Sequence, residues 1–284
     1  MSKKDFWKNK NVLFIGDSIT YALSNAYPKH VCKLLGCNFE VHGKPGAQIK
    51  TMIDGDIDGN DPFFAPIKPI CAKDFEDKDL VVLFGGFNNR WFDIGCENDV
   101  YNPQNGSGNT IYGLMQYSID RIKQELVNAN NPNCPLLVVT VYFCGKYSWN
   151  CYPADVKPPK YGCSFRDIAK VQIEVANKNG LAYCDLYEGS DIRPETWSIY
   201  CASPNPVNEK YTPYLLEKNG NKVNDEFLTY QTGKKYYQIR NGKVVLEQYE
   251  DACPYPFNGD QLHLNQKGYE HIASLVANSI LQIK

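Results

Sequence analysis

The chain has 284 residues, which is enough for one large domain or two small ones. Its 30 lysine and arginine residues stand against 32 aspartate and glutamate residues, so the net charge of −2 offers no basic excess for binding a nucleic-acid backbone. Hydrophobic residues make up 43% and charged residues 22%, a balance typical of a globular protein and not of a disordered one.

Membrane insertion and export are both disfavoured. No apolar run approaches the ~18 residues that a bilayer-spanning helix requires. The apolar stretch after Asn11 is too short for the hydrophobic region of a signal peptide. We therefore expect no membrane partner and, by default, a cytoplasmic location. A signal that has been removed, or release by lysis, stays open as a route to the outside.

The eleven cysteines are an odd number, so at least one thiol is unpaired. No Cys-x-x-Cys pair occurs, and the nearest two, Cys32 and Cys37, have four residues between them. A zinc site is therefore poorly supported. Reduced and mostly buried thiols are the favoured interpretation, and the sequence leaves open whether any of the cysteines pair.

Strand and helix patterns alternate along the chain. Ser164 and Asp167 form a capping-box pattern, and Asn265 is a good N-cap for the last helix. Such alternation predicts an α/β fold with a parallel five-stranded sheet and helices on both faces, and ligands then bind beyond the carboxyl ends of the strands. The expected elements, in chain order, are a strand at 11–15 closed by Gly16, a helix at 28–35 ending at Gly36, strands at 38–42 and 79–84, a helix at 110–130, a strand at 135–143, a helix at 164–179, a strand at 181–186 and a helix at 265–281.

Three stretches depart from this alternation: 54–78, 90–109 and 188–258. The last is rich in tyrosine and contains Asn219-Gly220 and Asn241-Gly242, which are strong hairpin-turn pairs. We interpret it as a hairpin-rich insertion in a single domain that spans residues 1–284.

Polar residues follow the predicted strands. Ser18 comes directly after Gly16-Asp17 at the first strand's end, where a serine is either an exposed nucleophile or a helix N-cap. Gly46 lies in the turn after the second strand and leaves backbone N–H groups accessible, although alone it indicates only a turn. Asn88 follows the third strand, where its amide can donate to an oxyanion or cap its own loop.

The segment before the last helix carries Asp260 and, three residues later, His263. At this spacing the carboxylate can hold one imidazole nitrogen, which leaves the other free to act as a base toward a serine hydroxyl. The alternative is a capping aspartate followed by a surface histidine. The other three histidines, His30, His42 and His271, lie in an early helix, at a strand end and inside the last helix.

Together these blocks resemble the SGNH hydrolases, also called the GDSL esterase/lipase family. The blocks Gly16-Asp17-Ser18, Gly46, Gly86-Phe87-Asn88-Asn89 and Asp260-Gln261-Leu262-His263 stand in the family's order, each at the end of a strand or before the last helix. The resemblance covers roughly residues 11–186 and 257–284 and omits the insertion. It implies a flavodoxin-like three-layer sandwich.

The resemblance also implies the roles of the site residues. Ser18 is the expected nucleophile, His263 the general base and acid, and Asp260 the residue that orients His263. The backbone N–H groups of Ser18 and Gly46 and the side chain of Asn88 form the expected oxyanion hole. No cofactor or metal is implied. One departure is visible, because Asn89 stands where the family usually has aspartate, which leaves the hydrogen bonding of that loop open.

The function expected from this resemblance is ester hydrolysis through an acyl-enzyme. The substrate class that we favour is a small-molecule or glycan ester, with an O-acetylated carbohydrate first. The expected substrate contacts are Asp17, Phe87, Asn89, Trp91 and Trp149.

Three alternatives stay open. A lipase, lysophospholipase or thioesterase can use the same fold and triad. A glycan-binding module without catalysis comes from another class, and a nucleotide-binding protein is poorly supported because no glycine-rich phosphate loop follows the first strand. The oligomeric state is not predicted.

One further pattern resembles half of a calcium loop. Asp54, Asp56, Asp58 and Gly59 match D-x-D-x-D-G, but the twelfth position is Ala65 instead of glutamate. A solvated acidic loop is the favoured interpretation, and a loose calcium site is the minor alternative.

Overall fold

The structure is a computed structural model that describes nine segments of the chain. Contacts divide the chain into two compact units, the first made of Met1–Tyr142, Pro159–Ser190 and Tyr269–Lys284, and the second of Phe143–Pro158 and Asp191–Gly268. The predicted insertion at 188–258 falls in the second unit apart from its first three residues, and the expectation of a single domain stays a prediction. The described residues are 3–21, 26–56, 66–143, 162–193, 196–200, 228–232, 235–240, 243–249 and 262–283.

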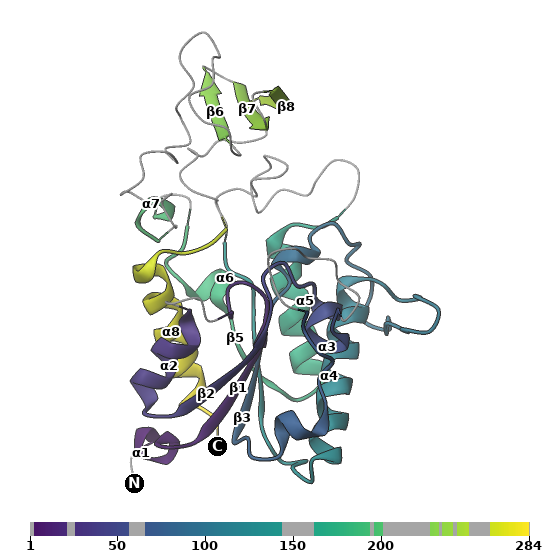
Figure 1. The fold of residues 1–284 in the computed structure, drawn as a ribbon, viewed down its shortest axis with the longest axis vertical. Helices are drawn as coiled ribbons and strands as arrows, with labels where there is room; N and C mark the ends of the chain where they lie inside the picture. Colours follow the sequence, from purple (N-terminus) through teal and green to yellow (C-terminus); the bar gives the residue numbers. More distant parts are fainter. Residues whose placement is uncertain are drawn as a thin grey trace. The chain divides into compact units, whose positions relative to one another are not determined.

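A five-stranded parallel sheet forms the centre of the first unit, in the order β2-β1-β3-β4-β5 (Figure 1). This confirms the predicted α/β fold and all five of the predicted strands. The strands are β1 (Asn11–Gly16), β2 (Asn38–Gly43), β3 (Leu80–Phe84), β4 (Leu136–Val139) and β5 (Ala182–Cys184).

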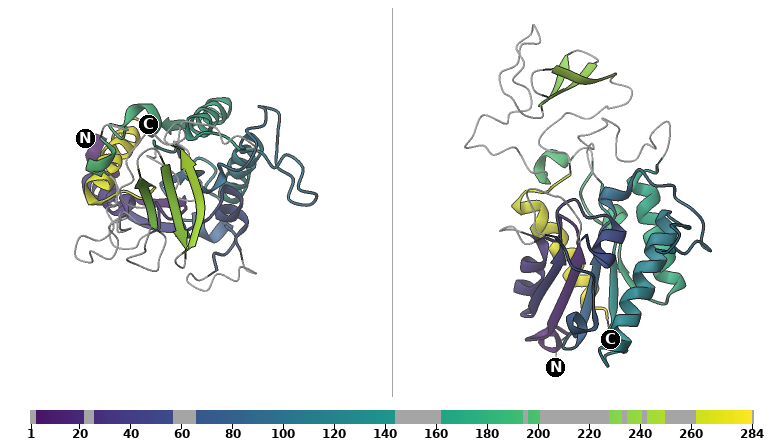
Figure 2. Two further views of the ribbon diagram at one scale, coloured as in Figure 1. Left: turned by 90° about the horizontal axis from the view of Figure 1, so that it is seen from above. Right: turned by 45° about the vertical axis from the view of Figure 1, so that its right-hand side comes forward.

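Helices cover both faces of this sheet. In Figures 1 and 2, α3, α4 and α5 lie over one face, and α1, α2 and α8 lie over the other. No described helix has the length and apolar character needed to cross a bilayer. The helices of the first unit are α1 (Lys3–Trp7), α2 (Tyr27–Leu35), α3 (Ile49–Asp54), η1 (Ala72–Phe75), η2 (Phe87–Asn89), α4 (Ile111–Asn128), α5 (Phe165–Lys178) and α6 (Leu186–Gly189), and α8 (Gln266–Ile280) belongs to it from Tyr269 onward.

Local capping fixes where the helices begin and end. The Ser164 hydroxyl accepts from the Asp167 N–H at 3.1 Å and the Asp167 carboxylate accepts from the Ser164 N–H at 3.0 Å, so the predicted capping box is confirmed. Asn265 Oδ1 accepts from the Gly268 N–H at 2.9 Å, which confirms the predicted N-cap of α8. Gly36 ends α2 at φ +75°, a conformation that favours glycine.

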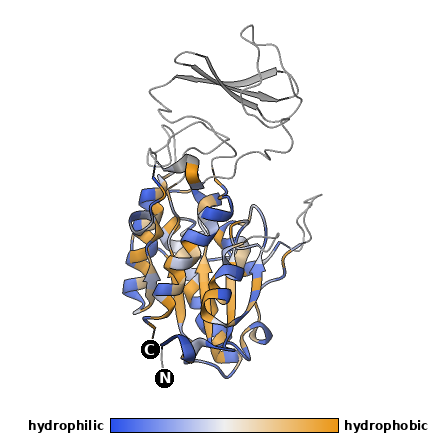
Figure 3. Ribbon diagram, turned by 90° about the vertical axis from the view of Figure 1, so that its left-hand side faces the viewer, coloured by the Kyte–Doolittle hydropathy of each residue, from blue (hydrophilic) through white to orange (hydrophobic). Residues whose placement is uncertain are grey.

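The sheet is buried on both faces, which explains why its strands appear in the sequence as nearly continuous apolar runs. Every residue of β3 and β4 is buried, and the hydropathy colouring of Figure 3 shows these strands as the apolar centre of the unit. The edge strand β2 is more exposed, and Phe39 retains 38% of its surface.

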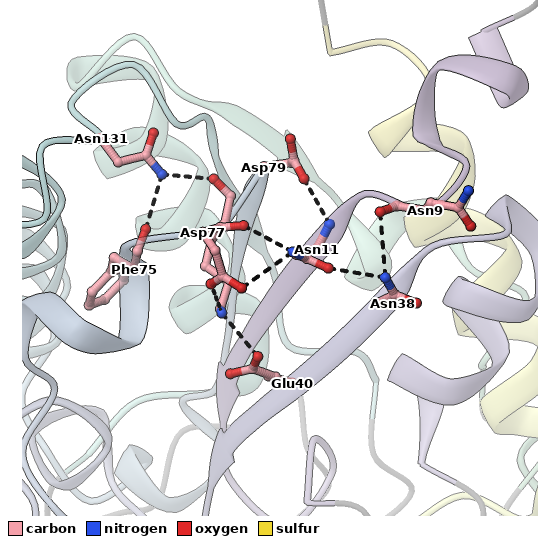
Figure 4. Close-up of polar contacts among 9 residues, drawn as sticks. Asn9, Asn11, Asn38, Glu40, Phe75, Asp77, Asp79 and Asn131 are labelled. Carbon is pink, nitrogen blue, oxygen red and sulfur yellow. Dashed lines mark hydrogen bonds and ion pairs between the residues drawn. The ribbon is translucent and has the colours of Figure 1, made fainter.

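Polar side chains join the amino ends of the strands (Figure 4). The Asn11 N–H donates to Asp79 Oδ2 at 2.8 Å, and Asn38 Nδ2 donates to Asn11 Oδ1 at 3.1 Å. Asn131 Nδ2 donates to the Phe75 carbonyl at 3.0 Å. These contacts satisfy backbone groups at the end of the sheet where the strands begin, here called the amino edge. The polar side chains at this end therefore stabilise the fold.

Some elements differ from the sequence prediction. The predicted strand at 135–143 pairs only over Leu136–Val139, because β5 ends at Cys184 and the chain turns into α6. The Thr140 N–H makes the last bond to β5, to the Cys184 carbonyl at 3.0 Å, and its hydroxyl accepts from the Leu186 N–H of α6 at 2.8 Å. Helices α1 and α3 are both absent from the prediction; each is only five or six residues long, and α3 lacks a side-chain cap.

The described part of the second unit contains a three-stranded antiparallel sheet, in the order β6-β7-β8. Strands β7 (Lys235–Arg240) and β8 (Lys243–Tyr249) flank Asn241-Gly242, the pair for which the sequence predicted a hairpin turn. Strand β6 (Leu228–Thr232) was not predicted. The unit also contains α7 (Trp197–Tyr200), whose Tyr200 carbonyl accepts from the Asn265 N–H at 2.8 Å. The other predicted turn, Asn219-Gly220, lies outside the described residues.

Candidate active site

Ser18 lies in a tight turn that follows β1 and is partly exposed. The turn is held by Asp17, whose carbonyl accepts from the N–H groups of Thr20 at 3.1 Å and Tyr21 at 2.9 Å. Asp17 Oδ1 also accepts from the Ile19 N–H at 3.0 Å. A Cβ at Gly16 would lie 2.1 Å from Thr20 Oγ1, so only glycine allows the turn to fold back this closely on the strand.

Gly46 lies in the turn after β2, beside the serine turn. The two strands are in register, with Gly43 opposite Gly16, so the two turns begin side by side. Gly46 has φ +77°, and a Cβ built there would meet no atom within 4 Å. Within the described part of the chain, no hydrogen bond uses the Gly46 N–H. This backbone donor therefore has no hydrogen-bond partner among the described residues.

Asn88 connects the third strand end to the other two. It lies in η2, which Gly86 introduces at φ +117°. Its side-chain Nδ2 donates to the Ala47 carbonyl at 3.0 Å and makes a longer contact of 3.5 Å with Asp17 Oδ2. The structure thus brings together three of the four predicted blocks, and Asn88 contacts both of the other loops directly.

Asn89 has a structural position. Its side chain is fully buried, and its Oδ1 accepts from the Ile49 N–H at 2.9 Å, at the first residue of α3. The sequence left the hydrogen bonding of this loop open, because the family usually has aspartate here. An amide oxygen serves as the acceptor for α3 as a carboxylate oxygen would, so the loop and α3 stay joined.

The five expected substrate contacts differ in exposure. Asp17, Phe87 and Asn89 have no exposed surface, so contact with a substrate would require their loops to open. The Phe87 ring packs at centroid distances of 4.7 to 5.7 Å against three aromatic rings of the core. Trp91 is 41% exposed and is accessible to a ligand. Trp149 lies outside the described residues.

Gln172 on α5 supports the site and was not found from the sequence. Its Nε2 donates to the Gly85 carbonyl at 2.6 Å, and its Oε1 accepts from the Val141 N–H at 2.8 Å. It is 1% exposed and joins the loops after β3 and β4. The available signal was an amide among the apolar residues of the predicted helix at 164–179, which indicates a buried polar group with defined partners.

A cavity of about 390 Å³ lies next to the serine turn. Tyr21 belongs to that turn, and Gly43 pairs with Gly16. Buried Lys44 forms an ion pair with Asp56, and hydrogen bonds from Lys44 and Ile67 outweigh burial and hold the pKa of Asp56 below its ordinary value. The described residues that line the cavity are Tyr21, Val41, His42, Gly43, Lys44, Pro66, Ile67, Lys68, Pro69, Cys71 and Asp74.

His42 is a partly buried ionisable group of that lining. Its Nε2 is buried without a hydrogen-bond partner in the described part of the chain. Burial lowers the pKa of His42, against the opposing effects of the Asp74 carboxylate and a hydrogen bond with the Met52 backbone. The imidazole is therefore held in its neutral form.

His263 belongs to the second unit and Ser18 to the first, and each is described within its own unit. His263 is partly exposed and stands between Leu262 and Leu264, which are both buried. Two residues later Asn265 caps α8. Asp260 lies outside the described residues. The pairing of His263 with Asp260 and with Ser18 stays a prediction.

The acidic calcium-like pattern divides between described and undescribed residues. Asp54 Oδ1 accepts from the Tyr117 hydroxyl at 2.6 Å, and Asp56 pairs with Lys44, so both carboxylates have protein partners. Asp58 and Gly59 lie outside the described residues. Over the described segments, no group of three or more His, Cys, Asp or Glu side chains is placed to hold a metal ion.

Comparison with known proteins connects this geometry to a family. The family model of GDSL-like lipases and acylhydrolases matches residues 14–271. No curated protein sequence matches the chain.

Solved structures share the fold at low sequence identity. A possible lipase from Chitinophaga pinensis DSM 2588 is 19% identical, covers 96% of this chain and 98% of its own, and gives a TM-score of 0.56. A protein from Lactobacillus plantarum is 18% identical over 69% of this chain and 86% of its own, with a TM-score of 0.50. An acetyl xylan esterase is 16% identical over 95% of this chain and 98% of its own, with a TM-score of 0.46. The matched family model spans most of the chain, and the chain belongs to the GDSL-like lipase/acylhydrolase family.

Proposed function

We propose that this member of an acylhydrolase family is a serine esterase that works through a covalent acyl-enzyme. The observation that carries the proposal is the junction of three strand ends, where Asn88 contacts both Ala47 and Asp17. This junction combines a partly exposed serine, an open backbone N–H at Gly46 and an amide side chain. A nucleophile and oxyanion donors on adjoining rigid turns are what acyl transfer requires.

In the proposed reaction, Ser18 Oγ attacks the ester carbonyl carbon while His263 accepts the hydroxyl proton. The carbonyl oxygen becomes an oxyanion, which the N–H groups of Ser18 and Gly46 stabilise. The Asn88 N–H that makes only the longer, 3.5 Å contact with Asp17 turns to the oxyanion as the third donor, and the other keeps its bond to Ala47. When the intermediate collapses, His263 gives its proton to the leaving alcohol. A water molecule then repeats the sequence on the acyl-enzyme and releases the acid, and Asp260 keeps the His263 imidazole oriented in both halves.

The proposed substrate class is an O-acetylated carbohydrate. The cavity beside the serine turn has the volume of a small ligand. Its polar lining includes Tyr21, His42, Lys44 and Asp74, and its apolar lining includes Val41, Pro66, Ile67 and Pro69. Hydroxyl groups of a sugar can exchange hydrogen bonds with such a lining, whereas an alkyl chain would leave these polar groups unsatisfied. A short acyl group on a hydroxyl-rich carrier fits this lining better than a long-chain lipid does.

The decisive experiment compares p-nitrophenyl acetate hydrolysis by the wild type and Ser18→Ala. We expect turnover by the wild type and background rates for Ser18→Ala. Ser274→Ala is the matched control, because Ser274 is an exposed serine of α8 whose hydroxyl bonds only to its own helix at Glu270. A folded wild type that hydrolyses no faster than Ser18→Ala would contradict the proposal and favour a glycan-binding module.

A second readout identifies the nucleophile itself. Diisopropyl fluorophosphate should phosphorylate Ser18 alone, which peptide mass spectrometry detects as a modified peptide absent from Ser18→Ala. Chain-length profiling then addresses the acyl group, with acetate, butyrate and octanoate esters in parallel. Faster cleavage of octanoate than acetate would replace the carbohydrate esterase with a lipase or thioesterase.

A further inference from the structure

Two cysteines meet at the carboxyl end of α2. Gly36 adopts φ +75° there, and the Cys32 carbonyl accepts from the Gly36 N–H at 2.7 Å and from the Cys37 N–H at 3.2 Å. The bond from the Cys37 N–H to the Cys32 carbonyl, with the left-handed Gly36 before Cys37, defines a Schellman motif. In this motif the side chains of the first and last residues frequently contact each other. In this chain those two side chains are Cys32 and Cys37, and the Cys32 thiol donates to the carbonyl of Asn38, the residue next to Cys37, at 3.6 Å.

We propose that Cys32 and Cys37 form a disulfide in an oxidising environment. A disulfide requires Cα atoms within ~7 Å and side chains that point toward each other. The two hydrogen bonds to the Cys32 carbonyl hold the residues within about one helical turn, and the bond from the Cys32 thiol to the Asn38 carbonyl directs that side chain toward the segment that carries Cys37. Both thiols are free in this structure.

The two thiols differ in a way that suits stepwise exchange. Cys32 is 3% exposed, whereas Cys37 is partly exposed and can meet an oxidant. The neighbouring Cys32 thiol holds the pKa of Cys37 below its ordinary value, and the neighbouring Cys37 thiol and burial raise the pKa of Cys32. Cys37 is therefore the attacking thiolate and Cys32 the resolving thiol.

The oxidant that we name is a small disulfide such as oxidised glutathione. Cys37 attacks one of its sulfur atoms, forms a mixed disulfide and releases one glutathione thiol. Cys32 loses its proton and attacks the Cys37 sulfur, which forms the protein disulfide and releases the second glutathione thiol. The protein loses two protons and two electrons, and one glutathione disulfide becomes two thiols.

The proposed Cys32–Cys37 disulfide lies at the end of the sheet opposite to the candidate active site. Cys37 immediately precedes β2, whose first residue, Asn38, contacts Asn9 and Asn11 at the amino edge of the sheet (Figure 4). The opposite end of β2, at Gly43, adjoins the serine turn. A disulfide would fasten the end of α2 to the start of β2, so we expect it to raise stability without changing ester hydrolysis. The inference is thus independent of the proposed function.

Three other described cysteines provide a comparison with this pair. Cys134 and Cys184 are buried, and burial raises the pKa of Cys134 to about 12 and that of Cys184 to about 11, so both stay protonated thiols. Cys71 is exposed and lines the cavity. It serves as the internal comparison, because its access to an oxidant does not depend on the Schellman motif.

The sequence allows a direct test, because trypsin cleaves after Lys33, between the two cysteines. The full chain is incubated with oxidised glutathione, its remaining thiols are blocked with N-ethylmaleimide, and the tryptic peptides are weighed. We expect residues 30–33 and 34–50 to appear as one linked species, since Lys44 precedes proline and is not a cleavage site. Reduction should separate them, and Cys71→Ser should give the same linked species.

Melting temperature gives a second measurement. Oxidation should raise the Tm of the wild type by roughly 4–8 °C, as expected for closing a short loop in a chain of this size. Cys37→Ser should show no such rise and the same ester hydrolysis as the wild type. Blocked Cys32 and Cys37 in the fully oxidised, folded protein, or linkage of either one to another cysteine, would overturn the proposal.

Discussion

The same residue types stand at both ends of the central sheet, the amino edge where the strands begin and the carboxyl edge where they end. Their contacts differ between the two edges. At the amino edge, Asn11, Asn38 and Asp79 bond to one another and to backbone groups. At the carboxyl edge, Asn88 bonds to two neighbouring loops while Ser18 stays partly exposed and the Gly46 N–H has no hydrogen-bond partner among the described residues. The comparison teaches that position at the sheet, more than residue type, separates an amide that joins strand starts from one that joins the loops of the candidate site.

The largest expected effect concerns the proposed base. His263→Ala should lower kcat for p-nitrophenyl acetate by about 10²–10⁴-fold, because no group would then accept the Ser18 proton. His271→Ala is the control, since it removes a histidine from the interior of α8. If the two variants had equal activity, His263 would not be the base.

Asp260→Ala should be milder than His263→Ala, because a poorly oriented imidazole can still accept a proton. Steady-state kinetics of the two variants side by side measure the difference. A loss as great as that of Ser18→Ala, accompanied by unfolding in circular dichroism, would instead make Asp260 a structural residue.

Asn88→Ala tests the carboxyl edge directly. It removes one oxyanion donor, so kcat should fall by about 10²–10³-fold with a smaller change in KM. The side chain also bonds to the Ala47 carbonyl, and a thermal melt is needed to show that the loops keep their fold. An unchanged kcat in a folded variant would remove Asn88 from the proposed oxyanion hole.

Asp79→Ala is the counterpart at the amino edge. The carboxylate accepts from the Asn11 N–H at 2.8 Å and from Lys10 Nζ at 2.7 Å, so its loss should lower the free energy of unfolding by about 1–2 kcal/mol. Activity per folded molecule should stay at the wild-type level. Asp79→Asn keeps an acceptor for the Asn11 N–H and should be less destabilising, which urea unfolding can measure. A kcat defect in Asp79→Ala would contradict the division between the two edges.

The smallest expected effect is a pH dependence from His42. Burial lowers the pKa of His42 in the folded state, so the unfolded chain binds the proton more readily. The stability that the neutral imidazole contributes is complete above about pH 6.5 and is lost as the pH falls through the folded pKa. Between pH 7.5 and 5.5, the Tm of His42→Gln should fall by about 2 °C less than that of the wild type. His271→Gln is the matched control, and an equal fall in both variants would refute the assignment.

Much of the fold followed from the sequence because burial and capping are local signals. The apolar runs gave all five sheet strands, and Ser164 and Asn265 gave helix starts that the structure confirms. The length of β4 could not be predicted from the sequence, because an apolar run indicates burial and does not show how many of its residues pair with a neighbouring strand. Thr140 is buried as fully as Val139, but it bonds to the start of α6.

Candidate site residues could be identified from the sequence where a suitable residue directly follows a predicted strand, as Ser18, Gly46 and Asn88 do. The support of the site was not. Gln172 reaches from α5 to the Gly85 carbonyl, 87 residues away in the chain, and no local pattern encodes such a contact. The exposure of the expected substrate contacts also depended on packing, since Phe87 turns into the aromatic core while Trp91 stays at the surface.

The sequence by itself determined which strands are buried, where glycine must stand, and which residues lie at strand ends, because these depend on neighbours within a few positions. Only the tertiary structure decided that Asn88 contacts the loops of Ser18 and Gly46, that Lys44 pairs with Asp56 beside a cavity, and that Asn89 supports α3. Parallel strands bring together residues that are tens of positions apart, and that proximity depends on strand order and register, which no single segment of the chain specifies.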